Sequence, residues 1–285
     1  MNSQNSQNLK GALLLAACLT LAAPARAQET SEAIQPDRPD VTNGTRIVPT
    51  GIVQVEFGGL YLRPSSNASA SSSPLTVRVG VTDWLETRIG VDGLLVQTNG
   101  PASTTGFGNV QLGAKIRLWA EPGGTPVLSI LPTINLPTAD ATRGLGSGDA
   151  DYTIAFLTGT DIYRRGHIDI NYGVGAIGSG VGQPHFTQHL LSASLSEAVT
   201  DRWNPYVEVF WFSRGEADGT SETSVDTGVI YEVGSHFAID GGVQFGVGGS
   251  SANVGVFGGL SMIVGGERAL NGRQRKIKTS GAKPR

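Results

Sequence analysis

Residues 75–92, LTVRVGVTDWLETRIGVD, alternate between apolar and polar side chains on both sides of a short turn. Mainly apolar residues fill every second position from Leu75 to Val81 and again from Leu85 to Val91. A period of two indicates a β-strand, because successive side chains of a strand point to opposite faces. Two such strands joined by a short turn predict an antiparallel hairpin.

The same pattern recurs along the chain, and its connections alternate between short and longer. Short connections fall near 82–84, 120–126, 161–166, 200–204 and 234–236, and longer ones at 64–73, 97–107, 138–150, 178–186, 214–222 and 247–251. Outer-membrane barrels show this alternation, and their tilted strands need about nine to eleven residues. We therefore predict an all-β, antiparallel up-and-down transmembrane β-barrel of about twelve strands. The candidate strands are 50–63, 74–82, 85–96, 108–119, 127–137, 151–161, 167–177, 187–199, 204–213, 223–233, 237–246 and 252–264.

A soluble β-sandwich is the competing fold, since it would also bury one face of each strand and expose the other. It does not explain strands of about nine to fourteen residues, because globular strands average about five or six. Nor does it explain the aromatic residues beside the short turns, which are typical of a membrane-interface girdle. These residues are Trp84, Trp119, Tyr163, Trp203 and Phe237.

The N-terminal residues 1–27 read as a signal peptide. Lys10 precedes the apolar run 11–23, and Ala25 and Ala27 form a small-residue cleavage site. We therefore expect export, a mature start near Gln28 and a place in the outer membrane. Residues 15–18, which end at Cys18, also resemble a lipoprotein cleavage box, and this remains the alternative processing site.

Composition and charge divide the rest of the chain into a lead-in, a barrel and a basic tail. Residues 28–49 are polar and Pro-punctuated, so we expect an irregular periplasmic lead-in before a barrel of residues 50–265. Residues 28–265 carry a net charge of −11, whereas residues 266–285 carry +6. The basic segment lacks apolar periodicity, which indicates a disordered tail. For an exported chain a solvated tail is favoured over contact with anionic lipid or polysaccharide, and we expect no nucleic-acid partner.

The charged strand residues identify the face that lines the barrel. An Arg or Lys on the lipid face at mid-membrane costs about 2–4 kcal/mol, so these side chains should face the lumen. We predict either an open pore between opposed charge sectors, with mild cation preference, or charges that pair and plug the lumen. The predicted lumen-lining residues are Glu56, Arg78, Glu86, Arg88, Asp92, Lys115, Arg117, Asp169, Glu208, Asp226, Glu232 and Asp240.

No catalytic or cofactor motif emerges, and we expect no enzyme activity, no cofactor and no metal site. His185 and His189 would lie about 13 Å apart on a strand, too far to share a metal. Asp149 and Asp151 form a short acidic pair that suits a solvated loop better than a Ca²⁺ site. A membrane-embedded hydrolase is the remote alternative.

That hydrolase would use His189 with Ser192 or Ser194. A nucleophile needs a positioned base, which in turn needs an orienting acid. No acid at a suitable spacing supports this combination.

Several short motifs, ordered along residues 36–264, carry a resemblance to a known family. They are Asp37-Arg38-Pro39-Asp40, Gly51-x-x-Gln54-x-Glu56-x-Gly58, Gly80-x-x-Asp83-Trp84-x-Glu86-x-Arg88-x-Gly90, Gly106-Phe107-Gly108-Asn109, Gly113-x-Lys115, Leu136-Pro137-Thr138, Gly146-Ser147-Gly148-Asp149 and Thr200-Asp201-Arg202-Trp203 with Glu208. In order and spacing they resemble the MetA-pathway-of-phenol-degradation family of outer-membrane transporter-like β-barrels.

The resemblance implies a channel for small solutes such as aromatic or other hydrophobic compounds, embedded in outer-membrane lipid. It also implies insertion by the barrel-assembly machinery, which such barrels assist with a terminal aromatic residue. This chain departs from that pattern, because its last strand ends at Met262-Ile263-Val264 before the basic tail.

Taken together, these features predict diffusion through a polar, net-acidic lumen gated by the loops at 97–107, 138–150 and 178–186. The alternative is a structural or adhesive outer-membrane barrel with a plugged lumen.

Overall fold

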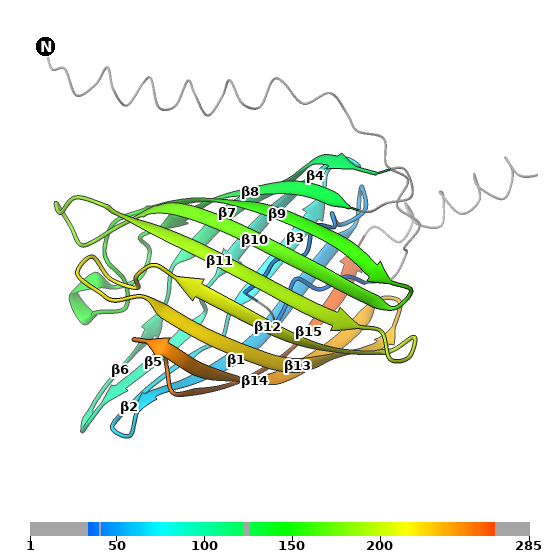
Figure 1. Cartoon of the computed structure of the whole chain (residues 1–285). Helices are drawn as coiled ribbons and strands as arrows, with labels where there is room; N and C mark the ends of the chain where they lie inside the picture. Colours follow the sequence, from blue (N-terminus) through cyan, green and yellow to red (C-terminus); the bar gives the residue numbers. More distant parts are fainter. Residues whose placement is uncertain (1–33, 40, 122–125, 266–285) are drawn as a thin grey trace, which may run out of the picture.

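The computed structural model describes residues 34–39, 41–121 and 126–265, and shows a closed antiparallel β-barrel (Figure 1). The barrel closes where the first strand pairs with the last, for example at Gly59 opposite Gly258. Within the described residues twelve strands form the closed wall, which confirms the predicted fold class. They are β1 (Val53–Ser65), β3 (Leu75–Gly80), β4 (Leu85–Val91), β7 (Val110–Ala120), β8 (Val127–Leu136), β9 (Asp151–Tyr163), β10 (Gly166–Ile177), β11 (Phe186–Glu197), β12 (Trp203–Phe212), β13 (Glu222–Gly234), β14 (Phe237–Gly249) and β15 (Val254–Gly265).

Three further strands, β2 (Ala68–Ser72), β5 (Leu94–Asn99) and β6 (Ala102–Phe107), extend the sheet beyond the barrel wall (Figure 1). The C-terminal part of β1, from Leu60 to Ser65, pairs with β2. In turn, β2 pairs with β5, and β5 pairs with β6. The predicted loops at 64–73 and 97–107 are therefore wrong, because both are largely strands. These segments consist largely of Ala, Ser and Thr, so neither face is clearly apolar and the sequence shows no alternation with a period of two. Their backbones nevertheless pair as strands.

Glycine marks one place where the extension leaves the barrel. Gly93 lies between β4 and β5 with φ 70°, in the left-handed region that favours glycine. A Cβ at this position would lie 1.9 Å from the carbonyl oxygen of Ser73. The β4–β5 connection can therefore approach the β2–β3 connection this closely because Gly93 has no side chain.

The short connections all lie at one end of the barrel, as predicted. They join β3 to β4, β7 to β8, β9 to β10, β11 to β12 and β13 to β14. The opposite end carries longer connections, including 137–150, which contains the 3-10 helix η1 (Ala141–Arg143). We refer to these as the short-turn end and the long-loop end.

The two faces of the wall differ as the alternation predicts. Ile89 on the outer face of β4 is 57% exposed, whereas Arg78 and Lys115 on the inner face are 1% and 0% exposed. Large apolar side chains therefore cover the outside, and charged ones lie inside. At the short-turn end, Trp119 and Trp203 remain exposed on the outer surface, as expected of an interface girdle. Across the described ranges no helix is long and apolar enough to cross a membrane.

The lead-in lies inside the barrel, which corrects the expected periplasmic position for its described part. We call residues 34–39 and 41–49 the lumen segment. It is irregular, as predicted, and it enters at the short-turn end, where the Ile34 N–H donates to the Ser235 carbonyl over 2.9 Å. Ile34, Ile47 and Val48 are almost fully buried. The signal peptide, Cys18 and the basic tail lie outside the described residues.

Candidate functional site in the lumen

A cluster of cations covers one side of the lumen, where β3, β4 and β7 lie side by side. The Arg78 guanidinium donates to Glu56 over 2.7 Å and to both carboxylate oxygens of Glu86 over 2.8 and 2.9 Å. Arg88 also donates to Glu86, over 2.8 Å. Register places these residues together, since Arg78 lies opposite Arg88, and Glu86 opposite both Gly80 and Lys115. The inner face predicted from the sequence thus forms a network in which each charge has a partner.

Asp37 of the lumen segment completes this network. Its carboxylate lies 2.7 Å from Lys115 Nζ and 3.4 Å from the Arg78 guanidinium, and it accepts a hydrogen bond from Arg88. Burial by itself would raise the pKa of Asp37, but the three cations outweigh burial and hold that pKa well below its usual range. Lys115 also donates to the Gly44 carbonyl over 2.5 Å. One side of the lumen therefore holds the segment through charge.

The opposite side of the lumen holds the same segment through Glu208 on β12. Its carboxylate accepts the N–H of Val41 over 3.0 Å and also the N–H and hydroxyl of Thr42. The Thr42 hydroxyl lies 2.9 Å from the Ser192 hydroxyl on β11. Asp226 on β13 lies opposite Glu208 in the register and is buried. The segment thus bridges the basic and acidic walls.

A third anchor connects the segment to the seam of the barrel. Arg38 lies 3.3 Å from Asp240 on β14 and donates to the Gly258 carbonyl on β15 over 3.2 Å. Gly58 and Gly259 leave room for this guanidinium, because a Cβ at Gly58 would lie 2.1 Å from its central carbon. Glycine on the inner face here permits the close approach of the arginine.

The remaining predicted lining residues lie toward the two ends of the barrel. Asp92 accepts the Asn109 N–H over 2.9 Å near the long-loop end. Asp169 lies 3.3 Å from His167, and Glu232 accepts from Asn204 over 3.0 Å, both near the short-turn end. Arg117 is buried and donates to the Asp83 carbonyl in a short turn.

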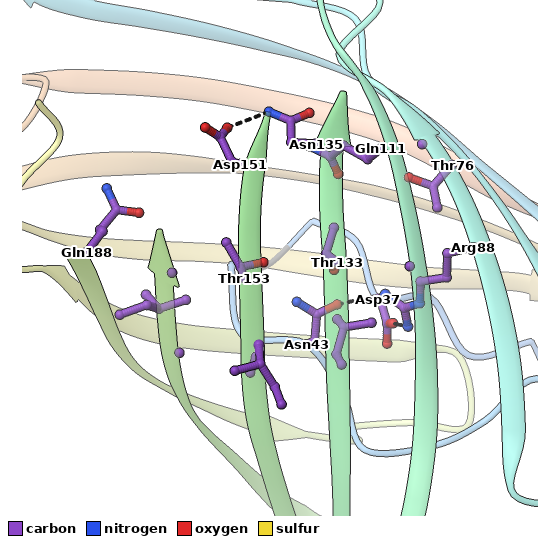
Figure 2. A pocket seen from close by; sticks show the side chains of 18 of the residues that line it. Asp37, Asn43, Thr76, Arg88, Gln111, Thr133, Asn135, Asp151, Thr153 and Gln188 are labelled. Carbon is purple, nitrogen blue, oxygen red and sulfur yellow. Dashed lines mark hydrogen bonds and ion pairs between the residues drawn. The ribbon is translucent and has the colours of Figure 1, made fainter. Parts of the chain in front are cut away.

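Two cavities lie on opposite sides of the lumen segment. The outer cavity, of about 490 Å³, opens toward the long-loop end, and its walls include Thr76, Thr133 and Thr153 (Figure 2). The inner cavity, of about 460 Å³, lies toward the short-turn end beside Asp161 and His167. Asp37 lines both. The segment therefore separates two polar chambers of similar size.

The alternative catalytic groups are not brought together. His189 faces outward on β11, where Nδ1 lies 3.0 Å from the Tyr172 hydroxyl, whereas Ser192 and Ser194 are buried on the lumen face. His185 instead contacts the Ala150 carbonyl, away from His189. In the described ranges, no group of three or more His, Cys, Asp or Glu residues could hold a metal ion.

Sequence reasoning missed the segment's own residues, including Asp37, Arg38 and Thr42, and the neutral threonines of the outer cavity. One available signal was that four lumen cations lie on adjacent strands with few acids among them. Those cations needed a partner from elsewhere in the chain, and an acidic stretch directly precedes β1.

Comparison with known proteins places the fold. A family model described as "Putative MetA-pathway of phenol degradation" matches residues 36–263. The structure is similar to an outer membrane channel from Pseudomonas putida F1, with 12% identity, 81% of this chain and 100% of that chain covered, and a TM-score of 0.61. It is also similar to the NanC porin, with 11% identity, coverage of 74% and 100%, and a TM-score of 0.52. At these identities the likeness shows the fold alone. No curated protein matches the sequence.

Proposed function

Because the chain belongs to the family described as "Putative MetA-pathway of phenol degradation", we propose that it is an outer-membrane channel for small solutes. The apolar outer face and the aromatic residues at the short-turn end support a place in outer-membrane lipid. The observation that carries the proposal is the pair of polar cavities inside a closed barrel. They lie along the lumen on the two sides of the lumen segment, and Asp37 of that segment lines both. No chemical step is part of this function.

The lumen segment is the constriction of this channel, in place of the loops that we expected to gate it. It lies between the cavities and is held by Lys115, Glu208 and Asp240 on three parts of the wall. Each contact is a hydrogen bond or an ion pair, and none is covalent. Solutes pass when the segment moves aside, and its anchors set how often it does so.

The family description and the P. putida channel support transport of small molecules. Aromatic or other hydrophobic compounds are the substrates that the family description suggests. The alternative, a structural barrel with a permanently plugged lumen, is favoured by the number of anchors on the segment. The two functions differ in whether the segment leaves.

A reversible disulfide separates these functions. The Thr42 and Ser192 hydroxyl oxygens lie 2.9 Å apart, so Thr42→Cys with Ser192→Cys can form a disulfide between the segment and the wall. Each single variant is the matched control, and Cys18→Ser removes the natural cysteine.

The measurement is single-channel conductance in a planar bilayer. We expect conductance from the reduced double variant, its loss on oxidation and its return with reductant. Folded protein, shown by heat-modifiable migration on a gel, that stays silent in both states would instead establish the plugged structural barrel.

A further inference from the structure

The charged residues that line the outer cavity balance one another. Among the described lining residues three are acids and three are bases, so their formal charges cancel. They are Asp37, Arg38, Glu56, Arg78, Arg88 and Asp151.

Each of these charges already has a partner. Asp37 and Glu56 contact the cations of the basic wall, and Arg38 contacts Asp240. The Asp151 carboxylate accepts the Asn135 amide over 2.9 Å and the Gly178 N–H over 2.8 Å. Figure 2 shows the Asp37–Arg88 and Asn135–Asp151 contacts beside the cavity. No charge on the described lining is left without an ionic or hydrogen-bonding partner.

This balance discriminates against ions. A charged solute that enters loses hydration, and that loss is offset only where the site supplies an opposite charge or several hydrogen bonds. Here it would have to displace an existing ion pair, or the two hydrogen bonds that hold the Asp151 carboxylate, to obtain one. An uncharged solute needs no such exchange, so the cavity favours neutral molecules.

A row of neutral hydroxyl groups faces the same space. Thr76 on β3, Thr133 on β8 and Thr153 on β9 line the cavity, and within residues 34–39, 41–121 and 126–265 their hydroxyls have no hydrogen-bond partner. The Gln111 amide on β7 lies between them (Figure 2). Hydroxyls can both donate and accept, so they match solute hydroxyls in either orientation. Because the row spans several strands, a solute with one hydroxyl satisfies only part of it.

Apolar side chains complete the lining. Leu131 on β8, Leu190 on β11 and Phe212 on β12 line the cavity. A cavity of about 490 Å³ lies within the range of small-molecule sites, about 300–1,000 Å³. Its lining therefore presents hydroxyl groups and apolar surface together.

We infer that the outer cavity is a binding site for an uncharged solute with several hydroxyl groups, such as a monosaccharide. The inference rests on the proposed channel function for its biological meaning, and it names a more hydroxylated solute than the aromatic compounds that the family description suggests. The site can be tested without transport. Thr76, Thr133 and Thr153 bind the solute hydroxyls, while Leu190 and Phe212 contact its apolar face.

The test is equilibrium dialysis of the refolded full-length chain in detergent, with four probes. Glucose is neutral, glucuronate carries a negative charge, glucosamine carries a positive charge, and phenol is neutral with one hydroxyl. We expect glucose to bind about tenfold more tightly than each of the others, the loss expected when buried polar groups find no partner. Thr133→Val with Thr153→Val should weaken glucose binding about tenfold, for two lost neutral hydrogen bonds. Thr87→Val, on the exposed outer face of β4, is the matched control and should change nothing.

The inference is overturned if a charged probe or phenol binds as tightly as glucose, if no probe binds to folded protein, or if the valine variant binds glucose unchanged. Liposome swelling distinguishes the channel from the site. Glucose binding without glucose permeation leaves the site standing and contradicts the proposed channel. Permeation that is equal for all probes, without preferential binding, leaves the channel standing and contradicts the site.

Discussion

Replacing Asp37 by Asn should release the lumen segment, because it removes the segment carboxylate that forms ion pairs with Arg78, Arg88 and Lys115. Glu56 and Glu86 remain, so three buried cations would then share two acids. Breaking a buried ion pair by removing one partner costs about 3–5 kcal/mol. We take the lower end, because an asparagine oxygen can still accept a hydrogen bond. About 3 kcal/mol corresponds to roughly a 150-fold fall in the ratio of docked to undocked segment.

Hydrogen exchange measures this ratio directly. The amides of Val41, Thr42 and Val48 donate to Glu208 and Glu86 only while the segment is docked. If exchange requires undocking, their protection should fall about 150-fold in the variant. Asp218→Asn makes the same charge change on an exposed loop and should leave protection unaltered. Protection within about threefold of the parent would refute the assignment of Asp37 as an anchor of the segment.

The effect should also depend on pH in one direction. The docked pKa of Asp37 lies below its ordinary value, so its contribution is fully present above that ordinary value, about 3.9. It is lost as the pH falls further toward the docked pKa, where the carboxylate becomes protonated. The difference in protection between parent and variant should therefore be constant above about pH 5 and shrink below about pH 4.

Three further substitutions test the wall. Ile89→Arg places a cation on the lipid face at a side chain that is 57% exposed, and should destabilise the barrel by about 2–4 kcal/mol in urea titrations followed by gel migration. Gly80→Ala would put a Cβ 2.1 Å from the Pro49 carbonyl oxygen, so it should lower stability by about 1–3 kcal/mol in the same titration. Trp203→Ala removes a ring whose centre lies 4.8 Å from that of Tyr231, and should cost about 0.5–1.5 kcal/mol beyond lost area by a double-mutant cycle.

The barrel wall was predictable because alternation is a local property of the chain. Arg78 and Arg88 could be placed on the inner face without any knowledge of their partners, since an outward position in lipid is too costly. The extension of β2, β5 and β6 escaped prediction for the same reason. The Ala, Ser and Thr residues of β2 and β6 are neither clearly apolar nor clearly polar, so alternation carries no signal there, whereas the first residues of β5 fell within the predicted strand 85–96.

The lumen segment could not be predicted from its own sequence. It has no period, and its contacts connect residues far apart along the chain, such as Thr42 with Glu208. Only the closed wall brings those partners within reach of one another. The sequence motif at Asp37 and Arg38 was visible, but its role depends on β3, β7 and β14 meeting around the same space.

The docked segment also explains how a barrel with a basic wall and an acidic wall can contain a cavity whose lining charges balance. While the segment is in place, Asp37 neutralises the basic wall and Arg38 neutralises Asp240. When it leaves, both charges leave with it. The basic wall then has three cations against Glu56 and Glu86, and the far wall keeps Glu208, Asp226 and Asp240 without Arg38. A transverse field of the kind predicted from the strands therefore belongs to the open lumen. The docked segment weakens that field and leaves the charges that line the outer cavity balanced, so that neutral solutes can occupy this cavity before the path opens.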